Sequence, residues 1–154
     1  MKAFVQILSV SLYVAGASII WNAAANADGN FTTILGTSPV AINLREDITG
    51  TYTDKIGEHG FLRSRDGAFT AFDAPGASDT VPRAIDPDGV ITGSYDDQSG
   101  TTRGFTRAGD GTFTTFDVPG HSETYPAAIN AGGVVTGTYC DPYPSGCGGF
   151  VRTK

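Results

Sequence analysis

Residues 66–107 read DGAFTAFDAPGASDTVPRAIDPDGVITGSYDDQSGTTRGFTR, and this stretch decides the fold class of the chain. Its apolar residues alternate over short runs that Gly, Pro and Asp interrupt, a pattern typical of strands joined by turns. We predict strands at Phe69–Phe72, Val81–Ile85, Val90–Tyr95 and Gly104–Arg107. Pro82 places the second of them at a sheet edge or a strand start, because proline has no N–H to donate.

The same four motifs occur three times in the same order along the chain. They are Asp-Gly-x-Phe-Thr at 28–32, 66–70 and 110–114; Thr-x-Pro-x-Ala-Ile-Asn/Asp at 37–43, 80–86 and 124–130; Thr-Gly-x-Tyr at 49–52, 92–95 and 136–139; and Gly-Phe at 60–61, 104–105 and 149–150. The isoleucines of the second motif are 43 and then 44 residues apart, a period typical of propeller blades. We therefore predict an all-β domain at 28–154 with three four-stranded repeats, 28–65, 66–109 and 110–154.

At these motifs the chain resembles the bacterial extracellular HAF repeat family. The resemblance covers residues 28–154 and includes Gly-Phe-x-Arg at 60–63, 104–107 and 149–152, and Phe-Asp-x-Pro-Gly at 72–76 and 116–120. The first unit departs from the pattern, with Ile34-Leu35-Gly36 in place of Phe-Asp-x-Pro-Gly, and His59-Gly60-Phe61 stands where the family has His-Ala-Phe. The resemblance implies export and a propeller-like fold, and it carries no catalytic residues to transfer.

Three repeats raise a question of closure, because propellers usually have four to eight blades. Open sheet edges invite pairing with another chain. The possibilities are self-association into a six-bladed ring, a truncated member of a longer family, or a closed threefold barrel similar to a β-trefoil. We favour propeller-like blades over the trefoil.

Recurring glycines and aromatic residues indicate how the repeats pack. Gly50, Gly93 and Gly137 lie inside the third strand of each repeat, where glycine indicates a bulge or a close backbone approach. The recurring aromatic residues are expected to pack between adjacent repeats. They are Phe61, Phe105, Phe150, Tyr52, Tyr95 and Tyr139.

The first 27 residues are interpreted as a secretory signal peptide. Lys2 precedes an apolar run from Ala3 to Trp21, and Ala23–Ala27 follows with small residues suited to cleavage after Ala27. A single transmembrane anchor and a strand of the fold are the alternatives. Cleavage would leave a secreted protein with no membrane contact, and the resemblance implies that it is bacterial and therefore extracellular or periplasmic.

Charge and cysteine content restrict the partners further. The net charge of −6 would become −7 on loss of Lys2, so the chain lacks the basic surface that nucleic acids require. Cys140 and Cys147 enclose a short proline-containing loop, and in an exported protein this spacing predicts a disulfide.

Candidate site residues are mainly carboxylates. Asp86, Asp88, Asp96 and Asp97 are weak calcium candidates, because oxygen ligands suit Ca²⁺, yet the same residues are typical of turns. His59 and His121 do not recur, and a triad of His121, Ser122 and an aspartate lacks the surrounding motif of a serine hydrolase. We expect no cofactor.

These observations support three functional hypotheses. The first is a secreted, non-catalytic scaffold that binds a glycan or a protein through the loops Asp96–Arg103 and Cys140–Cys147. The second is a hydrolase or lyase of extracellular polymers that uses the recurring Asp73 and Asp117. The third is a repeat fragment without independent function, which would aggregate when expressed alone.

Overall fold

The computed structural model describes residues 8–14, 17–23, 32–142 and 144–154. The chain divides into two compact units, Met1–Thr37 and Ser38–Lys154. In the first unit, β1 (Leu8–Val14) and β2 (Ala17–Ala23) pair antiparallel as a sheet of their own. This is the segment interpreted above as a signal peptide, and its cleavage stays a prediction. Within the described ranges there is no helix long and apolar enough to cross a membrane.

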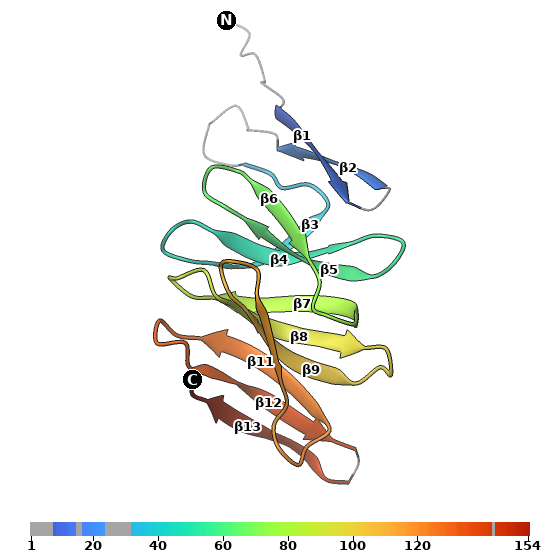
Figure 1. Cartoon of the computed structure of the whole chain (residues 1–154), viewed down its shortest axis with the longest axis vertical. Coiled ribbons are helices and arrows are strands. Elements are labelled where there is room, and N and C mark those ends of the chain that lie inside the picture. The colour runs from blue at the N-terminus through green and yellow to red at the C-terminus, as the bar shows by residue number, and fades with distance from the viewer. Residues whose placement is uncertain (1–7, 15–16, 24–31, 143) are drawn as a thin grey trace, which may run out of the picture. The chain divides into compact units, whose positions relative to one another are not determined.

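The second unit is all-β and contains three antiparallel sheets that follow one another along the chain, as Figure 1 shows. The first sheet has the order β3-β4-β5-β6, with β3 at Thr37–Ile42, β4 at Ile48–Thr53, β5 at Glu58–Arg63 and β6 at Phe69–Phe72. The second has the order β10-β9-β8-β7, with β7 at Ala77–Ile85, β8 at Ile91–Asp97, β9 at Thr102–Arg107 and β10 at Phe113–Phe116. The third has the order β11-β12-β13, with β11 at Glu123–Ile129, β12 at Val135–Asp141 and β13 at Gly146–Arg152.

None of these sheets closes into a barrel, so the propeller-like arrangement is confirmed and the trefoil alternative is wrong. Strand β7 packs on β4 and β5 of the sheet before it, and β11 packs on β8 and β9. The first and second sheets therefore each bury one face against the first strand of the next sheet, as successive blades do.

The sheets are offset by one strand from the sequence repeats. The strand after Asp66-Gly67 is β6, and it pairs with β5 as the outer strand of the first sheet. In the same way β10 completes the second sheet by pairing with β9. The turn Ser64–Gly67 is tight, with the Gly67 N–H bonded to the Ser64 carbonyl at 2.9 Å, so an antiparallel hairpin forms across the repeat boundary. Among the described residues, the third sheet has three strands.

Predicted and observed strands agree at their centres and differ at their ends. The strand predicted at Phe69–Phe72 is confirmed. The loop predicted at Asp96–Arg103 is wrong, because Asp96 pairs with Thr102 and Tyr95 with Arg103, leaving only a tight turn. The predicted strand after Asp28 begins outside the described residues, and Thr32 forms only an isolated bridge.

The recurring glycines permit a close approach between neighbouring strands. Gly93 lies opposite Pro82, and a Cβ at Gly93 would collide with the Val81 carbonyl and lie 2.8 Å from the Pro82 Cα. Gly137 meets Tyr125 and Pro126 in the same way. Each proline lies on an edge strand, beside a register shift that marks a bulge, so both expectations for these glycines are confirmed.

The core lies between the sheets and consists mainly of the recurring aromatic residues. Phe61 and Phe105 have no exposed surface, and Tyr52 and Tyr95 are buried. A buried threonine beside each phenylalanine bonds within its own sheet, with Thr92 Oγ1 donating to the Phe105 carbonyl at 2.9 Å. The predicted packing role is confirmed for the first two sheets.

Candidate functional site

One end of the sheets carries a basic side chain held between carboxylates in each of the first two sheets. In the first sheet, His59 at the start of β5 contacts Asp73 through Nδ1 at 2.9 Å and Asp54 through Nε2 at 3.1 Å. Its ring stacks on Tyr52, with centroids 5.0 Å apart. Burial opposes protonation of His59, but the two carboxylates outweigh it and raise the pKa of the imidazole.

The second sheet repeats the arrangement with arginine in place of histidine. Arg103 donates from Nε to Asp97 at 2.8 Å and from a terminal nitrogen to Asp117 at 2.5 Å. Hydrogen bonds from Ser99 and then from Arg103 hold the pKa of Asp97 far below its ordinary value. Asp73 and Asp117, the predicted catalytic pair, therefore each bind a different basic side chain of their own sheet.

The third sheet has no basic residue at this position, where Gly148 stands instead. His121 from the preceding loop fills the place, stacking on Tyr139 with centroids 3.7 Å apart and contacting Asp141 Oδ2 through Nδ1 at 2.6 Å. The Ser122 N–H donates to the same carboxylate at 2.9 Å. The predicted triad residues thus meet at Asp141, but Ser122 is bonded to the aspartate rather than to His121.

These three groups, which we call the carboxylate clasps, join strand ends and turns to one another. The hydrogen bonds that they receive lower the pKa of Asp54 and of Asp141, so both side chains are carboxylates at neutral pH. Each basic group is paired with a carboxylate, so the clasps give the recurring Asp73 and Asp117 a structural role.

The calcium candidates lie in two separate places. Asp86 is buried before β8 and accepts the N–H groups of Asp88 and Val90, both at 2.8 Å. At the other end of β8, Asp96 accepts the Thr102 hydroxyl at 2.6 Å, and Asp97 belongs to a clasp. Among the described residues, no group of three or more His, Cys, Asp or Glu side chains is placed to hold a metal ion.

The predicted disulfide is present between Cys140 and Cys147, which face each other across β12 and β13. The Cys140–Cys147 segment is therefore the end of a hairpin, closed by a covalent cross-link beside the paired residues Asp141 and Gly146. Both predicted binding loops, Asp96–Arg103 and Cys140–Cys147, are therefore strand ends joined by short turns.

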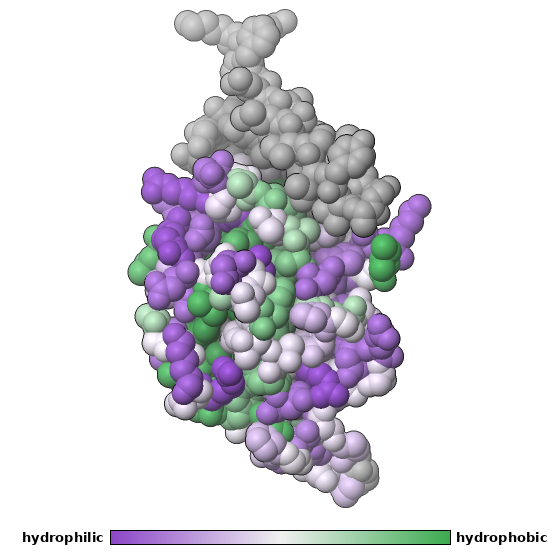
Figure 2. Space-filling view, viewed as in Figure 1, coloured by the Kyte–Doolittle hydropathy of each residue, from purple (hydrophilic) through white to green (hydrophobic). Residues whose placement is uncertain are grey.

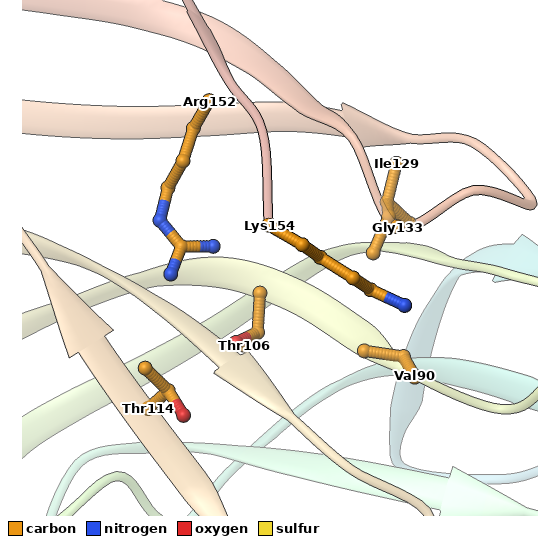
Figure 3. A pocket seen from close by; sticks show the side chains of 7 residues that line it. All are labelled: Val90, Thr106, Thr114, Ile129, Gly133, Arg152 and Lys154. Atoms are coloured by element: carbon orange, nitrogen blue, oxygen red, sulfur yellow. The ribbon is translucent and has the colours of Figure 1, made fainter.

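A pocket of about 300 Å³ lies between the second and third sheets, at the opposite end from the clasps. Figure 3 shows Arg152 and Lys154 extending across it, with the threonines of two neighbouring strands below them. Its lining consists of Val90, Thr106, Thr114, Ile129, Gly133, Arg152 and Lys154. The pocket combines two basic groups, two hydroxyls and two apolar side chains.

Arg152 is held in place by an aromatic ring. Its guanidinium carbon lies 4.5 Å from the centroid of Phe116, and Arg107 stacks on Phe72 in the same way at 4.7 Å. Arg107 is buried, and its Nε has no hydrogen-bond partner. Arg152 is half-buried and lines the pocket. The arginine of the Gly-Phe-x-Arg motif therefore packs in the interior in the second sheet and is accessible in the third.

The chain matches no protein-family model and no curated protein. The functional argument therefore rests on the pocket and its neighbours. Sequence reasoning missed Arg152 and Lys154 as candidate ligand-binding residues. The recurring Gly-Phe-x-Arg motif contained the signal for Arg152, since it places one arginine at the end of the fourth motif in every repeat.

Proposed function

We propose that this chain is an exported, non-catalytic β-repeat protein of the HAF type that binds an acidic glycan. The observation that carries the proposal is the pocket between the second and third sheets, where Arg152 and Lys154 adjoin the hydroxyls of Thr106 and Thr114. A guanidinium matches a carboxylate with two parallel hydrogen bonds, and an ammonium adds a second positive charge.

The remaining lining suits a sugar ring. Val90 and Ile129 supply apolar surface for its C–H groups, while the threonine hydroxyls can bond to its hydroxyls. The acidic character of the whole chain makes two adjacent basic side chains a local feature rather than part of a general basic surface. A uronic acid residue within an extracellular polysaccharide meets these requirements.

Binding fits the structure better than hydrolysis. Asp73 and Asp117 are occupied by His59 and Arg103, so neither is presented as an unpaired acid or nucleophile. Export is supported by the Cys140–Cys147 disulfide, since such bonds persist in oxidising compartments.

The proposal is tested by calorimetric titration, which measures the affinity of the protein for uronic acid oligosaccharides and for neutral oligosaccharides of the same length. Arg152→Gln and Lys154→Gln should each weaken binding roughly 10-fold or more, the equivalent of about 1.5–3 kcal/mol for a charge-assisted hydrogen bond. Arg65→Gln is the matched control, because its side chain is 74% exposed and lies away from the pocket lining.

Equal affinity for the neutral series, or equal losses in Arg65→Gln and Arg152→Gln, would show that the pocket does not recognise a carboxylate. Circular dichroism of each variant is needed because Arg152 also stacks on Phe116. Arg152→Lys keeps the charge and loses the two-pronged geometry, so intermediate affinity is expected.

A further inference from the structure

The two basic side chains of the pocket are anchored on different elements. The Arg152 guanidinium stacks on Phe116 at the end of β10. The Lys154 side chain lies over Gly133 in the turn between β11 and β12, where a Cβ on the glycine would be 2.7 Å from Lys154 Nζ. Figure 3 shows the guanidinium and the ammonium on opposite sides of the pocket. The two charges therefore face different positions of a bound ligand.

Both charges lack a counter-ion within the described part of the chain. Among the described residues, no ion pair includes Arg152 or Lys154. By contrast, Arg45 and Arg103 each pair with carboxylates of their own sheet. A ligand with a single acidic group would leave one of the two charges in the pocket without a partner.

The gap between the first and second sheets contains a similar basic side chain that is already neutralised. Arg45 lies over Gly89 in that gap, with a terminal nitrogen 2.7 Å from where a Cβ on the glycine would be. Its Nε pairs with Asp47 at 3.4 Å. The position equivalent to Asp47 in the next repeat is Val90, which lines the pocket near Lys154. The pocket thus lacks the carboxylate that the first gap supplies from the chain itself.

A smaller side chain also leaves room in the pocket. Thr106 of the lining occupies the position of Leu62 in the first repeat, and Leu62 packs against the hydrophobic core. The cavity of about 300 Å³ is of the size that small ligands occupy. Figure 2 shows apolar residues beside hydrophilic ones over the second and third sheets. A mixed surface of this kind suits sugar rings that carry charged groups.

We propose that the pocket binds two neighbouring acidic sugars of an uninterrupted polyuronate, with one carboxylate on Arg152 and the next on Lys154. This inference rests on the proposed function and names its ligand class. The guanidinium fixes the orientation of the first carboxylate through two parallel hydrogen bonds, whereas the ammonium attracts the second as a point charge. A polymer in which a neutral sugar follows each uronic acid would satisfy only one of the two charges.

A disaccharide of two uronic acids, its single methyl esters and its double methyl ester give the first test. They share their rings and linkage, and they carry two, one and no negative charges. Calorimetric titration of the full chain should show that the diacid binds roughly 10-fold or more tightly than a single ester, as one charge-assisted hydrogen bond provides. Each single ester should in turn bind more tightly than the double ester.

The three ligands separate failure of this inference from failure of the proposed function. Two carboxylates give an advantage of about twofold by statistics alone. If a single ester binds better than the double ester but the diacid gains no more than that, the inference is overturned and the proposed function stands. If all three ligands bind alike, the pocket recognises no carboxylate and both are overturned.

Replacement of Lys154 tests which group receives the second carboxylate. Lys154→Gln should lower the affinity for the diacid roughly 10-fold and that for a single ester by less, so the advantage of the diacid should disappear. The matched control is Lys55→Gln, in the exposed turn between β4 and β5 and outside the pocket lining. Equal effects of the two variants, or equal losses for diacid and ester in Lys154→Gln, overturn the proposal.

A carboxylate placed at position 90 should act as an internal competitor. Val90→Asp recreates the arrangement of Arg45 and Asp47, so it should remove the advantage of the diacid over a single ester. Val90→Asn is the matched control, because it is polar without charge and should keep that advantage. If both variants fold by circular dichroism and change the advantage equally, then pairing with Lys154 is not its cause and the proposal is overturned.

Discussion

Substitution of Gly93 by alanine should destabilise the second sheet through a clash with backbone. The new Cβ would collide with the Val81 carbonyl and lie 2.8 Å from the Pro82 Cα, and neither group can move without shifting β7. Its third neighbour, a ring carbon of Phe105 at 3.0 Å, belongs to a fully buried side chain. Overpacking of this kind costs about 1–3 kcal/mol.

Alanine also restricts the unfolded chain, which offsets about 0.4–1 kcal/mol of that cost. We therefore expect a net loss of roughly 1–2 kcal/mol for Gly93→Ala. With a denaturant slope of about 1–3 kcal/mol/M in urea, the unfolding midpoint should fall by about 0.3–2 M. Equilibrium unfolding followed by far-ultraviolet circular dichroism measures this shift.

The matched control is Gly109→Ala, in the turn between β9 and β10. A Cβ there meets only the Asp88 carbonyl, at 3.8 Å, and Arg65 occupies the equivalent position of the first repeat. This variant should be neutral or slightly more stable. If Gly93→Ala unfolds at the same urea concentration as Gly109→Ala, then the recurring glycine is not required by the approach of the proline strand.

Three further predictions concern a clasp, the disulfide and a buried hydroxyl. Because the folded-state pKa of His59 is raised, the stabilisation that His59 provides is complete below the ordinary value of 6.5 and is lost as pH rises through the raised pKa. The urea midpoint of the wild type should therefore exceed that of His59→Gln by more at about pH 5.5 than at about pH 8.5. A difference that does not change with pH would contradict this. Cys140→Ser combined with Cys147→Ser should lower the free energy of unfolding by about 2 kcal/mol, measured without reductant, and the addition of reductant should affect only the wild type. Thr92→Val should lower the free energy of unfolding by about 1–2 kcal/mol, because it removes the hydrogen bond to the Phe105 carbonyl. The control Thr115→Val, at an exposed position of β10, should change the free energy of unfolding little. Equal denaturation midpoints for the two variants would argue against a contribution from the Thr92 hydrogen bond.

Much of the fold could be predicted from the sequence because its signals are local. Alternating apolar residues gave Phe69–Phe72 as a strand, and the recurring Gly93 and Pro82 indicated a bulge and a close approach, which the structure confirms. Strand ends were less predictable. Because Asp96 and Thr102 are polar, the sequence predicts a loop there, but their side chains bond to each other across the hairpin and extend the ladder.

The pairing of strands and the pocket depend on information beyond a single repeat. Motif order does not state which strands are neighbours, although Asp66-Gly67 is a turn dipeptide typical of a hairpin between the flanking strands. The pocket exists because Arg152 and Lys154 extend over a gap between two sheets. No local pattern specifies such a gap, and the same arginine is buried one sheet earlier, as Arg107.

The one-strand offset between repeats and sheets has a consequence for how the chain unfolds. Each four-stranded sheet takes three strands from one repeat and its outer strand from the next repeat. Unfolding of one repeat therefore removes the outer strand of the sheet before it. Exchange of amide hydrogens in β4–β6 and β7–β10 should therefore show a shared opening free energy rather than one value for each repeat. A chain built from three similar pieces is thus expected to behave, in its stability, as a single cooperative body.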